Sequence, residues 1–239
     1  MNVLVTGAAG NGMGRSIALT LARDGFGVAV NYRTSESEAV ALVSHIVGRG
    51  GIAQAFGADI FEAGECENLV ESVSTELGAI DALVVNPGAG WNPAPASTLA
   101  PQAGMDDASK ELSPIFNLVP LVLPGMIERR WGRIVALTLL PPYDSPAYSY
   151  NAAKAARAST MQLLARDTWG QGVTVNTIGP GPVEAVDTLE TAVELADHGD
   201  AWSKRTNVTP QDVAEVASFL CSEAGRFVTG CSVPVQFNA

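Results

Sequence analysis

The sequence has few of the residues that build metal centres or disulfide frameworks. It contains only two histidines, and its three cysteines (Cys66, Cys221 and Cys231) form no C-x-x-C pair. So few ligand-forming side chains argue against a zinc site, and the scattered cysteines do not form the framework of a disulfide-rich secreted domain. We therefore expect no metal, reduced thiols and a cytoplasmic location.

Basic residues and long apolar runs are also scarce. The chain has 14 lysines and arginines against 25 aspartates and glutamates, a formal net charge of −11. This balance disfavours nonspecific binding to nucleic acid or to an anionic membrane, although a pocket can still be locally positive. The most apolar stretch, 115–127, is interrupted by an asparagine and two prolines, so we expect no membrane span.

A glycine-rich turn between a short apolar strand and a helix is the most informative feature present. Residues Val3 to Arg15 read V-L-V-T-G-A-A-G-N-G-M-G-R, with glycines at Gly7, Gly10, Gly12 and Gly14. Glycines let the main chain approach an anion, and the N-terminus of the following helix offers unpaired N–H groups. The turn therefore predicts a nucleotide diphosphate site, the alternative being a glycine-rich turn without a ligand.

Short apolar runs alternate with amphipathic segments along the rest of the chain. This alternation predicts a Rossmann-type α/β fold: a doubly wound parallel sheet of about seven strands with helices on both faces. We expect one domain covering 1–239. The expected strands are 2–6, 28–32, 52–56, 81–85, 133–138, 173–178 and 232–235. The expected helices are 15–24, 35–49, 65–77, 106–130, 148–169, 190–196 and 210–223.

Three of these expectations concern details. Ser35 and Glu38 form a capping-box pattern at the start of the second helix. Three prolines within 106–130 predict a bent or segmented helix. The segment 182–205 is a possible substrate lid, although its composition fits a surface excursion equally well.

Tyr150 and Lys154 lie four residues apart at the start of a long alanine-rich helix, so they share one helical face. An ammonium beside a phenol favours the phenolate, which prepares the tyrosine for proton transfer near neutral pH. An exposed pair on a helix would show the same spacing. The position after the fifth strand of a nucleotide-binding sheet favours a catalytic pair.

With these residues in view, the chain resembles the classical short-chain dehydrogenase/reductase family, and in particular 3-oxoacyl-carrier-protein reductases, over nearly its whole length. The matching segments follow the family order: T-G-A-A-G-N-G-M-G from Thr6, A-D-I from Ala58, V-N-P-G from Val85, G-R-I-V from Gly132, Y-N-A-A-K from Tyr150, V-N-T-I-G-P-G from Val175, F-L-C-S from Phe219 and T-G from Thr229.

The resemblance implies roles for the matching residues. Tyr150 would exchange a proton with the substrate oxygen, while Lys154 would lower the pKa of Tyr150 and hold the nicotinamide ribose. The positions implied to bind the cofactor, from diphosphate to nicotinamide, are Gly7, Asn11, Gly12, Met13, Asp59, Ile60, Asn86, Pro87, Gly88, Pro180, Gly181 and Val183. The resemblance also implies a homotetramer or homodimer, with helices 106–130 and 148–169 at an interface.

The end of the second strand indicates which nicotinamide cofactor is used. NAD-specific sites place a carboxylate there to bind the ribose 2′-hydroxyl. This chain reads Asn31-Tyr32-Arg33 and has no acid. Arg33 can pair with a 2′-phosphate, with Thr34 or Ser35 as further donors. We therefore expect NADP(H), although a solvated charge at a strand end would also account for Arg33.

Several positions depart from the family pattern. Counting from G-R-I-V, the place of the family's catalytic serine falls on Leu139, which cannot donate a hydrogen bond. The adjacent Thr138 is the candidate substitute, and Ser145 is a more distant one. The helical asparagine of the family's proton relay falls on Glu111, with Asn117 nearby.

Three functions remain open at this point. The first is NADP(H)-dependent reduction of a ketone or 3-oxo group to an alcohol, with Tyr150 as general acid. The second is proton transfer without net redox, as in an isomerase or lyase, and the third is nucleotide binding without catalysis. The family pattern favours the first, whereas the missing serine motivates the other two. The loop 88–105, which includes Trp91, suggests an uncharged or apolar small-molecule substrate.

Overall fold

The protein folds around one seven-stranded sheet with the order β3-β2-β1-β4-β5-β6-β7. The computed structural model describes residues 1–139, 146–199, 205 and 207–236. Every pair of neighbouring strands runs parallel. The strands are β1 (Asn2–Val5), β2 (Gly27–Tyr32), β3 (Ala53–Gly57), β4 (Ile80–Val85), β5 (Gly132–Leu137), β6 (Val173–Pro180) and β7 (Ser232–Val235). The predicted α/β fold is thereby confirmed.

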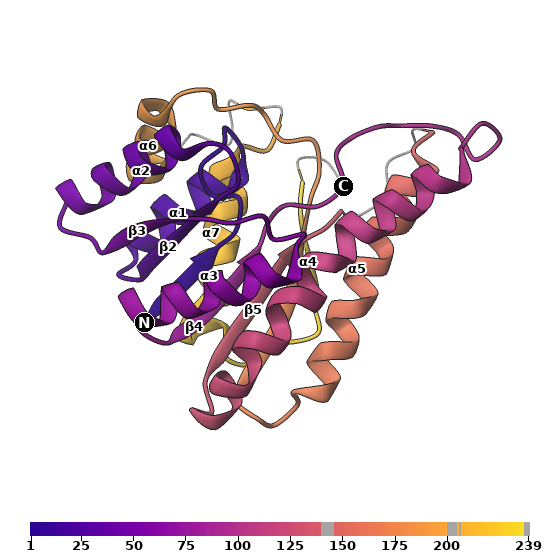
Figure 1. Cartoon of the computed structure of the whole chain (residues 1–239). Helices are drawn as coiled ribbons and strands as arrows, with labels where there is room; N and C mark the ends of the chain where they lie inside the picture. The colour runs from indigo at the N-terminus through magenta and orange to yellow at the C-terminus, as the bar shows by residue number, and fades with distance from the viewer. Residues whose placement is uncertain (140–145, 200–204, 206, 237–239) are drawn as a thin grey trace.

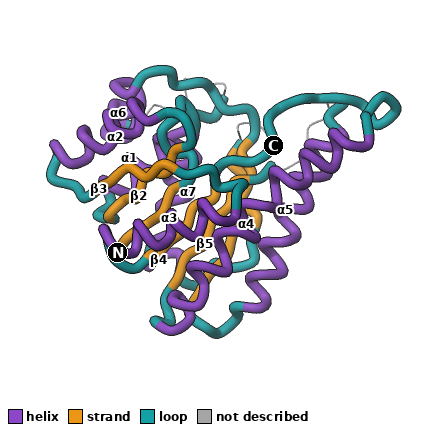
Figure 2. The backbone as a smooth tube through the Cα atoms, viewed as in Figure 1, coloured by secondary structure: helices purple, strands orange, loops and turns teal. Residues whose placement is uncertain are grey.

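Helices cover both faces of this sheet, as Figures 1 and 2 show. They are α1 (Met13–Arg23), α2 (Glu36–Gly48), α3 (Ala63–Glu76), α4 (Pro101–Glu128), α5 (Tyr148–Asp167), α6 (Leu189–His198) and α7 (Pro210–Cys221), followed by a short 3-10 turn (Glu223–Gly225). One apolar core lies under α1, α2, α6 and α7, and the other lies under α3, α4 and α5.

Each strand contributes to both cores because successive side chains point to opposite faces. On β1, Val3 and Val5 belong to one core, whereas Leu4 belongs to the other. Strands buried on both faces read as continuous apolar runs, which is why they are recognisable in the sequence. The strand order reverses between β1 and β4, and such a reversal opens a crevice at the carboxyl ends of the strands.

The helix α4 differs from the expectation in two respects. It begins at Pro101 rather than near 106, because a proline is well tolerated at the first helical position. Pro114, Pro120 and Pro124 all lie inside this one helix, so the expected segmentation is not found. The prolines remove main-chain hydrogen bonds from α4. Burial of Ile115 and its apolar neighbours, where α4 packs against α3 and α5, compensates for this loss.

The helix ends also test the capping predictions. Ser35 precedes α2, but its side chain makes no capping hydrogen bond, so the capping-box interpretation is wrong there. Glutamates in the first turn of α2 complement the helix dipole instead. Thr209 precedes α7, with Pro210 as the first helical residue, and the Thr209 N–H donates to Asp212 Oδ2 at 2.7 Å.

The segment 182–205, described through 199 and at 205, rests on α1. Arg15 donates to the Val186 carbonyl, and Arg23 Nη1 donates to the Ala196 carbonyl at 2.9 Å. Val183 forms an isolated parallel bridge with Val208. Its role as a lid stays a prediction. In the parts of the chain that the structure describes, no helix has both the length and the apolar character needed to cross a bilayer.

Candidate active site

The glycine turn after β1 forms an open cradle. Gly7 has a φ of +59°, and a Cβ atom there would lie 2.5 Å from Pro87 Cγ. A Cβ on Gly14 would lie 2.4 Å from the Gly7 carbonyl oxygen, whereas Cβ atoms on Gly10 and Gly12 would meet nothing within 4 Å. No side chain caps α1 at Gly12, so its first N–H groups are available to a phosphate. The cradle therefore fits the diphosphate of a dinucleotide.

Two asparagines hold this turn against the neighbouring strands. Asn31 Oδ1 accepts from the Gly7 N–H at 3.2 Å, and Asn31 Nδ2 donates to the Ala58 carbonyl at 3.1 Å. Asn86 Nδ2 donates to the Gly7 carbonyl at 3.3 Å, and the Asn86 N–H donates to Thr6 Oγ1 at 3.1 Å. The ends of β1, β2, β3 and β4 are thereby joined around the turn.

A cleft of about 690 Å³ opens at these strand ends. Six residues predicted to bind the cofactor line it: Gly7, Arg33, Asp59, Ile60, Pro87 and Gly88. Arg33 Nη1 lies 3.6 Å from Asp59 Oδ2, and 61% of the Arg33 side chain is exposed. An exposed pair at this distance is weak, so Arg33 can turn toward an anion in the cleft.

The other predicted cofactor residues lie outside the lining of this cleft. Asn11, Gly12 and Met13 belong to the turn and the first turn of α1. Pro180 ends β6, and the Gly181 N–H donates to the Val235 carbonyl at 2.9 Å. Val183 packs against the core under α1.

Sequence reasoning missed one wall of the cleft, which α4 provides through Ser109, Lys110 and Ser113. The four-residue spacing of the two serines was a signal for a shared helical face, and Ser113 Oγ donates to the Ser109 carbonyl at 2.7 Å. The sequence alone did not reveal that this face turns toward the cleft. Lys110 adds a second cation to the lining of the cleft, which also includes Arg33.

The predicted catalytic pair lies at the start of α5. Lys154 Nζ is 5.5 Å from the centroid of the Tyr150 ring. Trp91, from the loop between β4 and α4, packs edge to face on Tyr150, with ring centroids 5.1 Å apart and planes at 87°. The Tyr148 N–H donates to the Ala94 carbonyl at 3.1 Å, which fastens this loop to α5. Tyr150 is therefore half-buried beneath an indole ring.

Lys154 takes part in a buried ionic group that sequence reasoning did not foresee. Lys154 Nζ lies 2.9 Å from Glu111 Oε1, and Arg157 Nε lies 2.9 Å from Glu111 Oε2. Burial lowers the pKa of the Lys154 ammonium and that of the Arg157 guanidinium, while Glu111 acts in the opposite direction on both. The spacing of Tyr150, Lys154 and Arg157 on one face of α5 was the signal that could have identified Arg157.

The hydroxyl predicted to replace the family's serine is committed to another partner. Thr138 Oγ1 donates to the main-chain carbonyl of Lys154 at 2.9 Å, and Thr138 is buried. Leu139 is buried as well, and Ser145 lies outside the described residues. The hydroxyl of Thr138 therefore holds α5 against the end of β5.

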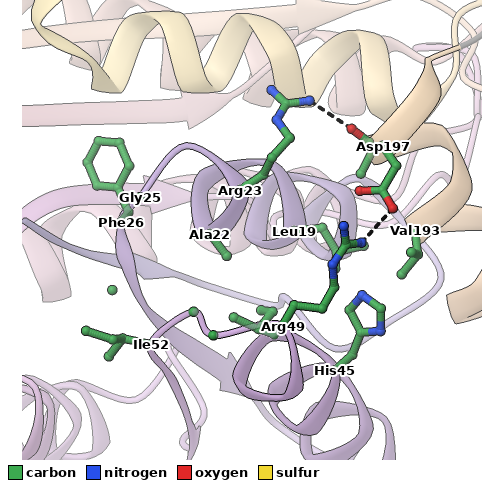
Figure 3. Close-up of a pocket in the computed structure, with 15 residues that line it drawn as sticks. Leu19, Ala22, Arg23, Gly25, Phe26, His45, Arg49, Ile52, Val193 and Asp197 are labelled. Atoms are coloured by element: carbon green, nitrogen blue, oxygen red, sulfur yellow. Dashed lines mark hydrogen bonds and ion pairs between the residues drawn. The ribbon is translucent and has the colours of Figure 1, made fainter.

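A second pocket, of about 440 Å³, lies between α1, α2 and α6, near the amino ends of β2 and β3 (Figure 3). Its ionic groups already have partners: Arg49 Nη1 lies 2.5 Å from Asp197 Oδ2, and Arg23 contacts Glu215 at 2.8 Å. Tyr150 and Lys154 line neither this pocket nor the cleft, but Glu111 connects Lys154 to Gly88 in the cleft lining. In addition, the described residues contain no group of three or more potential metal ligands. The candidate site is therefore the cleft at the carboxyl ends of the strands.

Comparison with known proteins places this arrangement in context. The profile of the enoyl-(acyl carrier protein) reductase family matches residues 7–236. A 3-oxoacyl-(acyl-carrier-protein) reductase of Staphylococcus epidermidis is 31% identical over 238 residues, which cover 98% of this chain and 97% of that protein.

Solved structures agree with these matches. A 3-ketoacyl-ACP reductase from Sinorhizobium meliloti superposes with a TM-score of 0.83 at 30% identity, covering 98% of this chain and 97% of that one. A 7α-hydroxysteroid dehydrogenase complexed with NADH and 7-oxo glycochenodeoxycholic acid gives a TM-score of 0.84 at 30% identity, covering 98% and 92%.

Proposed function

Because the chain belongs to the classical short-chain dehydrogenase/reductase family of nicotinamide-dependent oxidoreductases, we propose that it is an NADP(H)-dependent ketoreductase. Its substrate would be a small, uncharged or apolar ketone or 3-oxo compound, reduced to the alcohol. The names of the matched reductases and the apolar Trp91 beside Tyr150 support this substrate class.

The observation that carries the proposal is the connection, through Glu111, between Lys154 and the glycine-lined cleft. Lys154 Nζ contacts Glu111, and a Cβ atom on Gly88, which lines the cleft, would lie 2.3 Å from Glu111 Oε1. The Glu111 side chain thus lies between Lys154 and Gly88 of the cleft lining. A proton donor and a dinucleotide cradle in such proximity are what carbonyl reduction requires.

The proposed mechanism assigns each step to a protein group. When bound, the cofactor supplies the hydride for reduction and accepts it for oxidation. Tyr150 Oη donates its proton to the substrate oxygen as that oxygen gains charge. Lys154 Nζ stabilises the phenolate that remains, because an ammonium favours the charged form of a neighbouring phenol. Trp91 limits the access of water to Tyr150.

The choice of NADP(H) over NAD(H) is the finer part of the proposal. Arg33 and Lys110 line the cleft, and the end of β2 has no carboxylate to bind a ribose 2′-hydroxyl. A guanidinium binds a phosphate through charge-assisted hydrogen bonds. The proposed phosphate ligand is therefore Arg33, with Lys110 contributing a second positive charge.

One observation favours a second candidate function, proton transfer without net redox. The Thr138 hydroxyl donates to the Lys154 carbonyl, so its proton is not directed at a substrate oxygen. In this arrangement Thr138, the residue predicted to replace the family's serine, would be a positioning residue that holds the main chain at Lys154. Product formation at constant nicotinamide absorbance, from an enone or a β-hydroxy compound, would favour this second candidate.

The decisive test replaces Tyr150 with phenylalanine. Tyr150→Phe removes the proton donor but keeps the ring beneath Trp91, so kcat for ketone reduction should fall at least about 100-fold. NADPH affinity, measured by fluorescence titration, should change little. Tyr148→Phe is the matched control, because Tyr148 is exposed on the same helix. Turnover that survives in Tyr150→Phe would exclude the proposed acid.

The proposal includes a homotetramer or homodimer in the cytoplasm. Large apolar side chains are exposed on both α4 and α5, among them Phe116 and Leu163. Exposed apolar patches of this kind often mark an interface. All three cysteines are free thiols, as expected in a reducing compartment.

A further inference from the structure

Two members of the buried ionic group around Lys154, Glu111 and Arg157, have no part in the mechanism described so far. The Glu111 side chain is completely buried, as is that of Arg157, and only 9% of the Lys154 side chain is exposed. Burying three charged groups together is costly unless each finds a compensating charge. The group therefore needs an explanation beyond fold stability.

Glu111 is held from several directions. Its Oε1 atom accepts from the Ala89 N–H at 2.7 Å and lies 2.9 Å from Lys154 Nζ. Gly88 approaches the same carboxylate so closely that no side chain would fit there. These contacts join α4, α5 and the loop that follows β4 at a single carboxylate.

Arg157 is held just as firmly. Its Nε atom donates to the Glu111 carbonyl at 3.0 Å, and its Nη1 donates to the Leu137 carbonyl at 2.7 Å. Its Nη2 donates to the Pro87 carbonyl at 2.5 Å. Because the guanidinium cannot move away from these carbonyls, its charge stays beside the Glu111 carboxylate.

We propose that Glu111 is a positioning residue that holds the Lys154 ammonium at the Tyr150 ring, and that Arg157 balances the negative charge that Glu111 introduces. This proposal rests on the proposed function. A carboxylate alone would cancel the positive charge of Lys154 and weaken its effect on the phenol. With Arg157 present, the three groups carry a net charge of +1 next to Tyr150. A negative charge on Tyr150 would also act to raise the pKa of Arg157, which burial lowers.

The ionisable groups that act on Lys154 come from two helices. Glu111 on α4 raises the pKa of Lys154, whereas Arg157 on α5 lowers it together with burial. Tyr150, on the same helix, presents its ring to the ammonium. Removing the carboxylate and removing the guanidinium must therefore shift the titration of Lys154 in opposite directions, which general damage to the fold would not do.

The test measures Lys154 directly. The chain has three lysines, at 110, 154 and 204, so a protein labelled with ¹³Cε-lysine gives three NMR signals. Lys110→Arg and Lys204→Arg each remove one signal and thereby assign the third to Lys154. We expect its titration midpoint to fall by at least about one pH unit in Glu111→Gln and to rise in Arg157→Met. Glu215→Gln, which breaks the distant pair with Arg23, should leave it unchanged.

Turnover gives a second readout. Each single variant should lower kcat for ketone reduction at least about tenfold, and Glu111→Gln/Arg157→Met should recover most of that loss because a net charge of +1 is restored. If Glu111→Gln does not fold, because it leaves two buried cations, Arg157→Met provides the test, since it keeps the Glu111–Lys154 pair. A Lys154 midpoint that is the same in wild type and in every folded variant would overturn the proposal. Absence of turnover in the wild type would instead contradict the proposed function, and the NMR result would still stand.

Discussion

Asn31 and Arg33 lie two residues apart at the end of β2 but differ in burial. The buried residue has a structural role, and the exposed one is available to a ligand. Asn31 is buried, and its amide group both accepts from the Gly7 N–H and donates to the Ala58 carbonyl. A carboxylate could accept but not donate, which explains why an amide suits this position. Arg33 is exposed in the cleft and is only loosely paired with Asp59. Asn31 therefore shapes the cradle, and Arg33 is available to a ligand.

A prediction at the residue scale concerns the choice of cofactor. Arg33→Ala should raise the Kd for NADPH about tenfold or more, because it removes a charge-assisted hydrogen bond to the 2′-phosphate. The Kd for NADH should change little, since NADH has no phosphate at that position. Fluorescence titration with both cofactors measures the two values.

Arg49→Ala provides the matched control for this experiment. Arg49 is also exposed and paired with an aspartate, but it lies in the second pocket, between α1, α2 and α6. It should leave both affinities unchanged. If Arg33→Ala lowered the affinities for NADPH and NADH equally, Arg33 would not be a ligand of the 2′-phosphate.

At the scale of elements, the strand–turn–helix unit of β1 and α1 has almost no free space. The Gly7 carbonyl and the Asn86 side chain both lie where a side chain on Gly14 would begin. The turn is thus compressed against α1 but has space at Gly10, which lines the cleft, and at Gly12. Close packing on one side gives the cradle its shape on the other.

Gly14→Ala should therefore damage both stability and binding. The new Cβ would lie 2.4 Å from the Gly7 carbonyl oxygen and 2.8 Å from Asn86 Nδ2, so the turn must shift. We expect a loss of about 1–3 kcal/mol in the free energy of unfolding. NADPH affinity should also fall, as measured by titration of the folded variant.

Gly10→Ala separates close packing from a general intolerance of side chains in the turn. A Cβ on Gly10 meets nothing within 4 Å, and the φ of Gly10 is not positive. Its thermal midpoint should equal that of the wild type. If both alanine variants unfolded at the same temperature as the wild type, the contacts around Gly14 would not exclude a Cβ atom, contrary to this prediction.

At the scale of the whole molecule, ion pairs join distant parts of an acidic chain. Hydrogen bonds from Arg23 lower the pKa of Glu215, across the contact between α1 and α7. At Asp24 and Asp212 burial acts to raise the pKa, but hydrogen bonds involving Arg23 and Arg205 outweigh it, so both values are lowered. Three carboxylates near α7 are therefore more acidic in the folded state than in the unfolded chain.

These lowered pKa values predict acid sensitivity. A carboxyl group with a lowered pKa contributes stability that is fully present above its unfolded pKa of about 4, and this contribution is lost as the pH falls through the folded value. The free energy of unfolding should be steady above about pH 5 and decline toward about pH 3. Urea unfolding followed by circular dichroism across this range measures the decline.

Glu215→Gln tests the origin of this effect, because glutamine keeps the size of the side chain but does not titrate. The variant should be less stable at neutral pH and lose less stability on acidification. A variant with the same pH dependence as the wild type would remove Glu215 from the explanation.

The sequence by itself determined the α/β class, the positions of most elements and the glycine cradle, because these depend on short-range patterns of apolar residues and glycines. It also placed Tyr150 and Lys154 on one helix, while their catalytic role stays a prediction. Helix ends were less predictable: α4 extended back to Pro101 and continued through three prolines because packing outweighed their local preference.

Only the tertiary structure decided the strand order and the partners of the polar side chains. Arg157 donates to the carbonyl of Glu111, 46 residues earlier in the chain, and Thr138 donates to the main chain of α5. Such contacts depend on how α4 and α5 pack against each other and against the end of β5. The residue spacing within one helix or strand carries no information about this packing. The sequence therefore showed that the chain departs from the family pattern at Glu111 and beside Thr138, but not which groups these residues contact.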